Sequence, residues 1–396
     1  MDLGYAGGPV TDAGRVARPA LDLMVAQDGA LIEGWWKAFE GEAAGSAYQR
    51  FDWADAYLGT LGQVEGAAPR IVVGRDAGGA TAFILPLVLC HRGPLRLALP
   101  VGGAHANYHA ALWRRGAPLG DPRALLAAIG RLVGADAVAL AAMPRSWNGE
   151  PNPLVPAGAP AAASNAYRLD LSGSGEDVLK RVLSREARKK LRQKEARLAE
   201  LGPVELRQAA TPEEVEAVLA TFFAHKAERR RTIGLPNPFE DAPARAFLRR
   251  ACLAGLDRGA PAVELYSLCA GERIVATFAG AADETRLSGM VLSFDAGDSE
   301  IARRSPGDLL VARLVAEQCR RGRKVLDLGV GEARYKSTFC DGVDEIADVL
   351  VPVTPLGHAY GLAAAARRLA KRSVKRTPWA WSLVTRLRRG TAAGRD

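Results

Sequence analysis

The chain lacks the features that mark secreted and membrane-spanning proteins. Its five cysteines include no C-x-x-C pair and their number is odd, which argues against a disulfide framework or a cysteine-rich zinc site. No run of about 18 apolar residues occurs, so no transmembrane helix is expected. Residues 1–19 have no apolar core of the kind that a signal peptide needs, and we expect them to form a disordered leader. These absences predict a cytoplasmic protein.

The sequence also lacks a convincing metal-binding motif. It contains no H-E-x-x-H sequence, and its one close histidine pair, His105 and His109, lies in a glycine-rich loop with no third ligand nearby. We therefore expect no metal ion.

Basic residues outnumber acidic ones, and the formal net charge is +9 at pH 7. Much of the excess lies in a predicted helix over residues 176–201 and in the segment after residue 367. A basic surface favours anionic partners such as CoA phosphates, acidic glycans or an anionic membrane face, although arginine-rich helix faces can also serve solubility alone. The predicted helix carries charges on all sides and no aromatic residues, so no nucleic acid partner is expected.

The length of 396 residues is sufficient for two domains. Residues 144–163 are rich in proline, alanine, glycine and asparagine, which predicts a linker. We expect an N-terminal domain over residues 20–160, a C-terminal domain over 161–356 and a basic tail over 357–396. The tail is similar to a basic interfacial helix, which could give the protein a peripheral contact with an anionic membrane. Pro378 would break such a helix, and a disordered tail fits the sequence equally well.

Hydrophobic periodicity predicts the same order of elements in both halves. In the first half we expect strands over residues 70–74, 81–89 and 95–101, a helix over 121–134 and a strand over 137–142. In the second half we expect strands over residues 262–269, 273–281 and 286–294, a helix over 305–321 and a strand over 324–328. The parallel is one of architecture, because the two halves share little sequence.

Two short motifs in the second half point to chemistry. Ser305, Pro306 and Gly307 open the predicted helix, and a helix start of this kind can bind a diphosphate, although a surface helix without a ligand could begin in the same way. The second motif, VLDLGVG over residues 325–331, looks by itself like the glycine loop of S-adenosylmethionine-dependent methyltransferases. Against that interpretation, the usual third glycine is Ala333 and the preceding strands have an antiparallel pattern.

Taken together, these motifs resemble a known family. The succession Ser305-Pro306-Gly307, Gly322, Asp327-x-Gly329 and Tyr335-Lys336 resembles bacterial GNAT-superfamily acetyltransferases of the CelD/BcsL type, which are associated with cellulose or exopolysaccharide synthesis. The chain is more distantly similar to the Fem-type aminoacyltransferases that build peptidoglycan cross-bridges. The resemblance covers roughly residues 30–355.

The resemblance implies a tandem duplicated GNAT-like fold of the α/β (α+β) class, with mixed, mostly antiparallel sheets flanked by helices. It implies an acyl-CoA-dependent N-acyltransferase that uses acetyl-CoA as cosubstrate and acts on an amine of an envelope glycan or its precursor in polysaccharide biosynthesis. Two alternatives stay open: a Fem-like transferase that uses aminoacyl-tRNA, and the methyltransferase suggested by the glycine motif.

The family also implies where the cosubstrate binds, namely between two splayed central strands. The backbone of one strand and the start of the next helix would then contact acyl-CoA, through Met290, Val291, Leu292, Ser305, Pro306 and Gly307. Four side chains near the strand end are candidates for catalysis: Asp327, Glu332, Tyr335 and Lys336. Lys336 is favoured, because the equivalent lysine of Fem-type enzymes is thought to stabilise negative charge. Asp327 could equally organise the glycine turn, and Tyr335 could pack on the sheet.

The acceptor is expected in a groove between the halves. In the first half, His105, Asn107 and Tyr108 belong to the loop that tends to face the substrate in this family. In the second half, Arg188 lies in the basic helix and could contact an anionic acceptor. His225 could act as a base or form the polar edge of an amphipathic helix.

Overall fold

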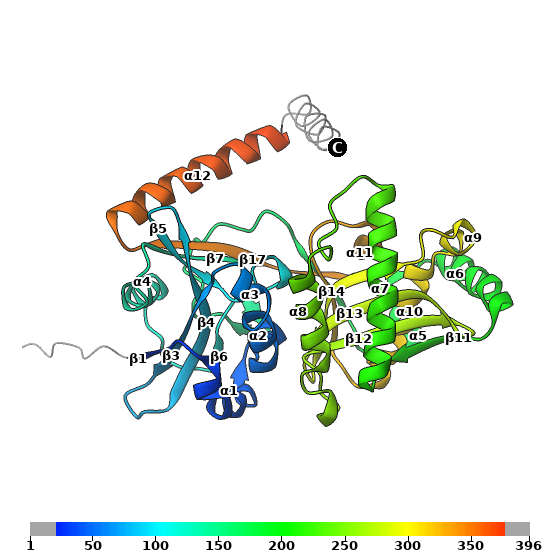
Figure 1. Ribbon diagram of the computed structural model, residues 1–396, viewed down its shortest axis with the longest axis horizontal. Coiled ribbons are helices and arrows are strands. Elements are labelled where there is room, and N and C mark those ends of the chain that lie inside the picture. The colour runs from blue at the N-terminus through cyan, green and yellow to red at the C-terminus, as the bar shows by residue number, and fades with distance from the viewer. Residues whose placement is uncertain (1–20, 377–396) are drawn as a thin grey trace, which may run out of the picture.

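The computed structural model describes residues 21–376 and contains two large sheets that lie side by side, each flanked by helices (Figure 1), and a small sheet of β8 (Ser146–Trp147) and β9 (Glu150–Pro151). The first sheet has eight strands and the second has seven. Among the described strands, one pair in each large sheet runs parallel and the other pairs run antiparallel. The predicted α/β fold with two similar halves, mixed sheets and flanking helices is therefore confirmed. No helix within residues 21–376 is long and apolar enough to span a membrane.

The first sheet follows the predicted order of strands. Across the sheet the order is β1 (Asp22–Ala26), β3 (Ala68–Arg75), β4 (Thr81–Arg92), β5 (Leu95–Pro100), β7 (Ala137–Pro144) and β17 (Ile346–Pro352). The short strand β6 (Leu112–Arg114) pairs with the start of β4, and β2 (Ala43–Ala44) pairs with β6. Helix α4 (Pro122–Leu132) connects β5 to its parallel neighbour β7. It begins as predicted, because the Asp121 side chain accepts a hydrogen bond from the Ala124 N–H and Pro122 occupies the first turn.

The second sheet repeats this arrangement. Its order is β11 (Val204–Gln208), β12 (Val263–Ala270), β13 (Arg273–Ala282), β14 (Arg286–Phe294), β15 (Val325–Val330), β10 (Ala166–Asp170) and β16 (Gly342–Asp344). Helix α10 (Pro306–Arg320) connects β14 to its parallel neighbour β15, as α4 connects β5 to β7. Three antiparallel strands, a helix and a parallel strand thus occur twice, and the duplicated architecture is confirmed.

One strand of the second half joins the first sheet. β17, near the C-terminal end of the described chain, returns to the first sheet and pairs antiparallel with β7, whereas β10 pairs antiparallel with β15 in the second sheet. Helix α12 (Pro355–Arg376) then packs on β17. Sheet membership therefore does not follow the predicted domain boundary at residue 356, because Ile346, Ala347, Val349 and Val351 are buried in the core of the first half. The predicted leader and the tail beyond residue 376 lie outside the described residues.

Helices cover both faces of the second sheet. One face carries α7 (Pro212–Thr232) and α8 (Ala242–Leu253), and the other carries α10 with α5 (Gly175–Val182). The single helix predicted over residues 176–201 is wrong, because α5 ends before Leu183 and a second helix, α6 (Arg185–Leu198), follows. Leu183 is extended, and the Ser184 side chain caps α6 by accepting a hydrogen bond from the Ala187 N–H.

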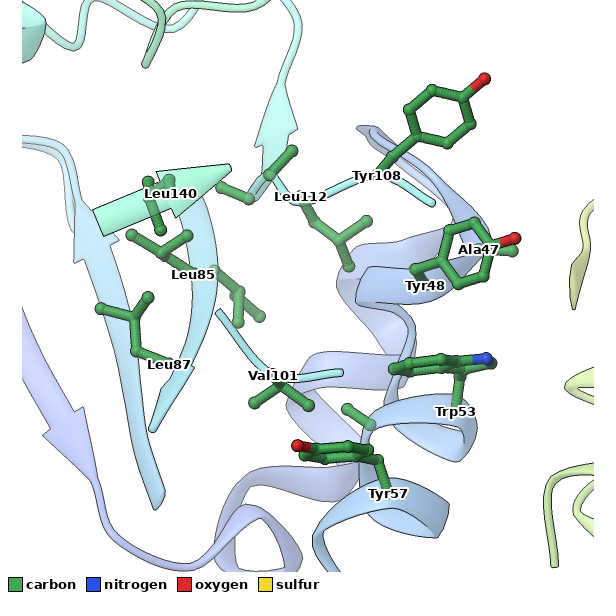
Figure 2. Close-up of a cluster of buried hydrophobic side chains, with 14 of the residues drawn as sticks. Ala47, Tyr48, Trp53, Tyr57, Leu85, Leu87, Val101, Tyr108, Leu112 and Leu140 are labelled. Atoms are coloured by element: carbon green, nitrogen blue, oxygen red, sulfur yellow. The ribbon is translucent and has the colours of Figure 1, made fainter. Parts of the chain in front are cut away.

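The interface between the halves is built largely from aromatic side chains. Helix α2 (Phe51–Leu58) packs against α8, and the Trp53 ring meets the Phe247 ring edge-on at 5.3 Å. Figure 2 shows Trp53 and Tyr57 with nearly parallel rings, 6.2 Å apart, beside Tyr48. The segment predicted as a linker also packs here, since Trp147 is buried. The interface fixes the relative position of the halves and, with it, the site described next.

Candidate active site

Strands β14 and β15 begin as neighbours and then separate. Their parallel pairing ends at Ser288 and Asp327, although β14 continues to Phe294 and β15 to Val330. Beyond this point the two strands form a fork whose facing backbone groups are not paired with each other. We call this feature the second fork, because it lies in the second sheet.

An extra residue in β14 contributes to the opening of the second fork. Ala279 of β13 lies opposite Val291, and Gly280 lies opposite Gly289, so Met290 forms a β-bulge with no residue opposite it. A bulge bends its strand and increases the local twist. The gap predicted beside Met290 is present.

The second fork opens into a cleft that joins both halves of the molecule. It is lined by Asn107, Phe278, Gly289, Met290, Val291, Leu292, Leu328, Val330, Tyr335 and Lys336. The cleft therefore brings together the three backbone positions predicted for the cosubstrate and two of the four predicted catalytic side chains. Their roles stay predictions.

Lys336 is held at the end of β15 by helix α11 (Arg334–Phe339). Its ammonium group donates to the carbonyl oxygens of Gly329 at 3.1 Å and Val330 at 2.9 Å, and the residue is only 7% exposed. Burial lowers the pKa of Lys336, while the nearby carboxylate of Asp327 opposes that shift. An ammonium group has three donors, so one N–H remains for a ligand in the cleft.

Tyr335 lines the same cleft from the start of α11. Burial raises the pKa of its hydroxyl to about 12. The group therefore stays protonated near neutral pH and can donate a hydrogen bond, but it cannot serve as a base there.

The two candidate carboxylates do not line the cleft. Asp327 is 0% exposed, and its Oδ1 accepts a hydrogen bond from the Gly329 N–H at 2.6 Å. Asp327 thus organises the glycine turn, which is the alternative that the sequence left open, and burial raises its pKa. Glu332 is exposed and accepts a hydrogen bond from the Tyr167 hydroxyl.

The start of α10 lies against the far end of β14. A Cβ atom at Gly307 would come within 3.4 Å of the Leu292 side chain, so the helix approaches the strand closely. Ser305 has a left-handed backbone (φ 49°) and does not cap the helix; its hydroxyl accepts a hydrogen bond from Lys194 of α6 at 2.7 Å. The helix start and this lysine together make the end of the cleft electropositive.

Of the side chains predicted to bind the acceptor, only Asn107 reaches the cleft. Tyr108 is fully buried in the interface, so its side chain packs rather than facing a substrate. His105 packs against an aromatic ring of α8. Arg188 lines a separate groove between α5, α6 and α10, and His225 is partly buried on α7 outside the cleft. The predicted contacts of His105, Arg188 and His225 with the acceptor stay predictions.

Sequence analysis did not single out Lys226 of α7, which lies beside β14. Its Nζ lies 3.5 Å from the Leu292 carbonyl oxygen of β14. Burial, reinforced by Arg230 and Arg229, lowers the pKa of Lys226 to about 8. A signal existed, because Lys226 follows the buried Phe222 by four residues and so lies on the same face of the helix.

We expect Lys226→Met to stabilise the protein by about 1–2 kcal/mol at pH 7, because an apolar side chain avoids burying a charge. The folded pKa lies below the ordinary value of 10.5, so between about pH 8 and 10.5 the unfolded wild type binds more protons. The free energy of unfolding of the wild type should then rise with pH across this window, and the advantage of the variant should shrink. Denaturant unfolding at pH 7 and 9.5 measures this, with the exposed Lys189→Met as control. A constant difference between the two pH values contradicts it.

The equivalent fork in the first half is filled. Strands β5 and β7 pair in parallel only as far as Ala98 and Val138, and the loop that follows β5 then occupies the space beyond them. Within that loop the ring of His109 contacts the carbonyl oxygens of Ala141 at 2.7 Å and Gly103 at 3.0 Å. Among the described residues, no group of three or more potential metal ligands occurs here or elsewhere.

Comparisons with known proteins agree with this geometry. Residues 185–337 match the family model described as "Acetyltransferase (GNAT) domain". The fold is similar to that of FemX, with 11% identity, 85% of this chain and 99% of that chain covered, and a TM-score of 0.58. It is also similar to a C-terminal domain (DUF2156) from Agrobacterium fabrum, described as part of a lysylphosphatidylglycerol synthetase, with 12% identity, coverage of 86% and 96%, and a TM-score of 0.50. At these identities the likeness shows the fold alone. No curated protein sequence matches the chain.

Proposed function

We propose that this chain, whose residues 185–337 match the GNAT acetyltransferase family model, is an acyltransferase that transfers an acyl group from acyl-CoA to an amine. Acetyl-CoA is the proposed cosubstrate. The proposed acceptor is an amine of an envelope glycan or its precursor, as the resemblance to CelD/BcsL-type enzymes implies. The phosphates of CoA, and those of a nucleotide-linked precursor, suit the electropositive end of the cleft.

The observation that carries the proposal is the second fork. Where β14 and β15 separate, the β14 backbone beside Met290 and Val291 lines the cleft and is not paired with β15, whereas the neighbouring groups of Gly289, Gly329 and Val330 are bound by Asn107 and Lys336. The pantetheine arm of CoA is extended and has two amide groups, so it can take the place of a missing strand neighbour. The diphosphate would then lie at the start of α10, where the Gly307 N–H, the helix dipole and Lys194 favour an anion, while the Asp308 carboxylate in the first turn opposes it.

The chemistry follows from the groups around the cleft. The amine attacks the thioester carbon, the C–N bond forms, the C–S bond breaks, and the proton lost by the amine ends on the CoA sulfur. Negative charge develops first on the carbonyl oxygen, where donors in a preformed site have their greatest effect. Backbone N–H groups beside Met290 and the remaining N–H of Lys336 are positioned for this, and the Tyr335 hydroxyl can donate to the departing thiolate.

Calorimetry with the purified chain tests the proposal. We expect acetyl-CoA to bind with a dissociation constant between about 1 μM and 1 mM, the range in which enzymes commonly hold their substrates. S-adenosylmethionine, as the matched control ligand, should not bind. Release of free CoA in the presence of amino sugars then identifies the acceptor class. Binding of S-adenosylmethionine without acetyl-CoA would instead support a methyltransferase, and turnover with aminoacyl-tRNA alone would support a Fem-like reaction.

A further inference from the structure

Asn107 belongs to the first half but lies inside the second fork. Its Nδ2 donates to the carbonyl oxygen of Gly289 at 2.8 Å, and its Oδ1 accepts a hydrogen bond from the Val330 N–H at 3.2 Å. Gly289 directly follows Ser288, the last residue of β14 that pairs with β15, and Val330 ends β15. One side-chain amide therefore bridges the two strands just beyond the point where their own pairing stops.

The bridge is supported from both sides. The Asn107 amide also donates to the Tyr48 hydroxyl at 2.7 Å, and this buried hydroxyl donates in turn to the Ser288 carbonyl at 3.3 Å. Gly329 makes room for the amide, since a Cβ atom there would lie 2.8 Å from the Asn107 nitrogen. Both N–H donors of the amide are thus used by protein groups, so the predicted contact between Asn107 and a substrate is limited to the second lone pair of Oδ1.

The same loop also closes the fork of the first half. His109 stands only two residues after Asn107, and its buried ring fills the space beyond the β5–β7 pairing. A single loop therefore occupies both forks: its histidine fills one, and its asparagine bridges the other while the cleft beside it stays open.

We infer that Asn107 is a positioning residue, supplied by the first half, that sets the spacing of β14 and β15 so that acyl-CoA meets a preformed cleft. The inference rests on the proposed function. Without the amide, the Gly289 carbonyl and the Val330 N–H lose their partners, and the strands either close on each other or admit water. Either change removes the preorganised spacing on which tight binding of the pantetheine arm depends.

The test compares two ligands on Asn107→Ala. Acetyl-CoA should bind at least about tenfold more weakly than to the wild type. Adenosine 3′,5′-diphosphate, which lacks the pantetheine arm, should bind equally to both, whereas a loss of overall structure would weaken both ligands. Asn148→Ala is the control, because this exposed amide also crosses between the halves, to Thr285 at 3.3 Å, but lies away from the cleft. Its affinity for both ligands should match that of the wild type.

Asn107→Asp keeps the result interpretable if the alanine variant unfolds. A carboxylate can still accept from the Val330 N–H but turns an oxygen toward the Gly289 carbonyl, which repels it, so acetyl-CoA affinity should again fall by at least about tenfold. Unchanged or tighter acetyl-CoA binding in the folded variants, or an equal loss of both ligands, overturns the inference. Failure of the wild type to bind acetyl-CoA would instead refute the proposed function itself, so the two failures are distinguishable.

Discussion

Lys336→Ala is expected to lower kcat by about 10²–10³, the usual cost of removing one donor that stabilises a developing oxyanion. The side chain is buried at the end of β15, with two of its three donors on backbone carbonyls and the third free for the cleft. Because that third contact strengthens as charge develops on the substrate, the KM for acetyl-CoA should change by only a few-fold. Steady-state kinetics on the acceptor found by CoA release measures both constants.

Two variants separate the chemical role of Lys336 from a structural one. Lys336→Arg keeps the positive charge, but its planar group cannot reproduce the same contacts, so we expect partial recovery of kcat. Lys336→Met fills the space without a donor and should behave like alanine. Melting temperatures of all three should be compared first, since the ammonium also ties α11 to β15. A folded alanine variant with unchanged kcat would remove Lys336 from the mechanism.

Local signals in the sequence were sufficient for most individual elements. Thr211 and Glu214 form a capping box at the start of α7, a pattern of local residues, and the apolar periods place the core strands of both sheets within a few residues. The backbone positions of the cleft came from the resemblance to GNAT enzymes, applied to these elements. The resemblance assigns the cosubstrate to the strand that contains Met290 and to the helix that begins after Ser305, and it needs no knowledge of side-chain contacts.

Long-range pairing could not be read in the same way. A strand such as β17 has the same alternating pattern in either sheet, so periodicity does not reveal that it returns to the first half. The sequence pattern did not reveal the break between α5 and α6, because only the capping residue Ser184 marks it within an otherwise helical charge pattern. The side chains that fill the two forks were equally hidden, because Asn107 and His109 acquire their roles from carbonyl groups that lie in other strands.

The two halves of the duplicated fold differ at their forks. Both halves have the same parallel pair that separates after a few residues. Only the second keeps a bulge at Met290 and a lined cleft, while the first has its fork closed by its own loop. A fold that binds a ligand between splayed strands must hold those strands apart when the ligand is absent, and a second copy of the fold is one source of the necessary contacts.

Arg286→Ala is expected to lower the free energy of unfolding by about 3–5 kcal/mol, the cost of leaving a buried charge without its partner. Arg286 is 4% exposed, and its guanidinium lies 2.7 Å from Asp344 and 3.7 Å from the fully buried Asp327. It also stacks on Trp147 of the first half, with 4.1 Å between the guanidinium carbon and the ring centroid. The substitution thus removes both the counter-charge at the base of the second fork and a contact between the halves.

The loss should depend on pH in a defined direction. Burial already raises the pKa of Asp327 in the folded protein, and removing Arg286 should raise it further. A carboxyl group with a raised folded pKa stabilises the protein at low pH, and this contribution is lost as the pH rises. The difference between wild type and variant should therefore be larger at pH 7 than at pH 4.5 in denaturant unfolding.

Arg273→Ala, which breaks an exposed ion pair with Asp295, should cost no more than about 1 kcal/mol. An equal cost for the two arginines, or a pH-independent loss at Arg286, would mean that the buried cluster does not hold the fork as described.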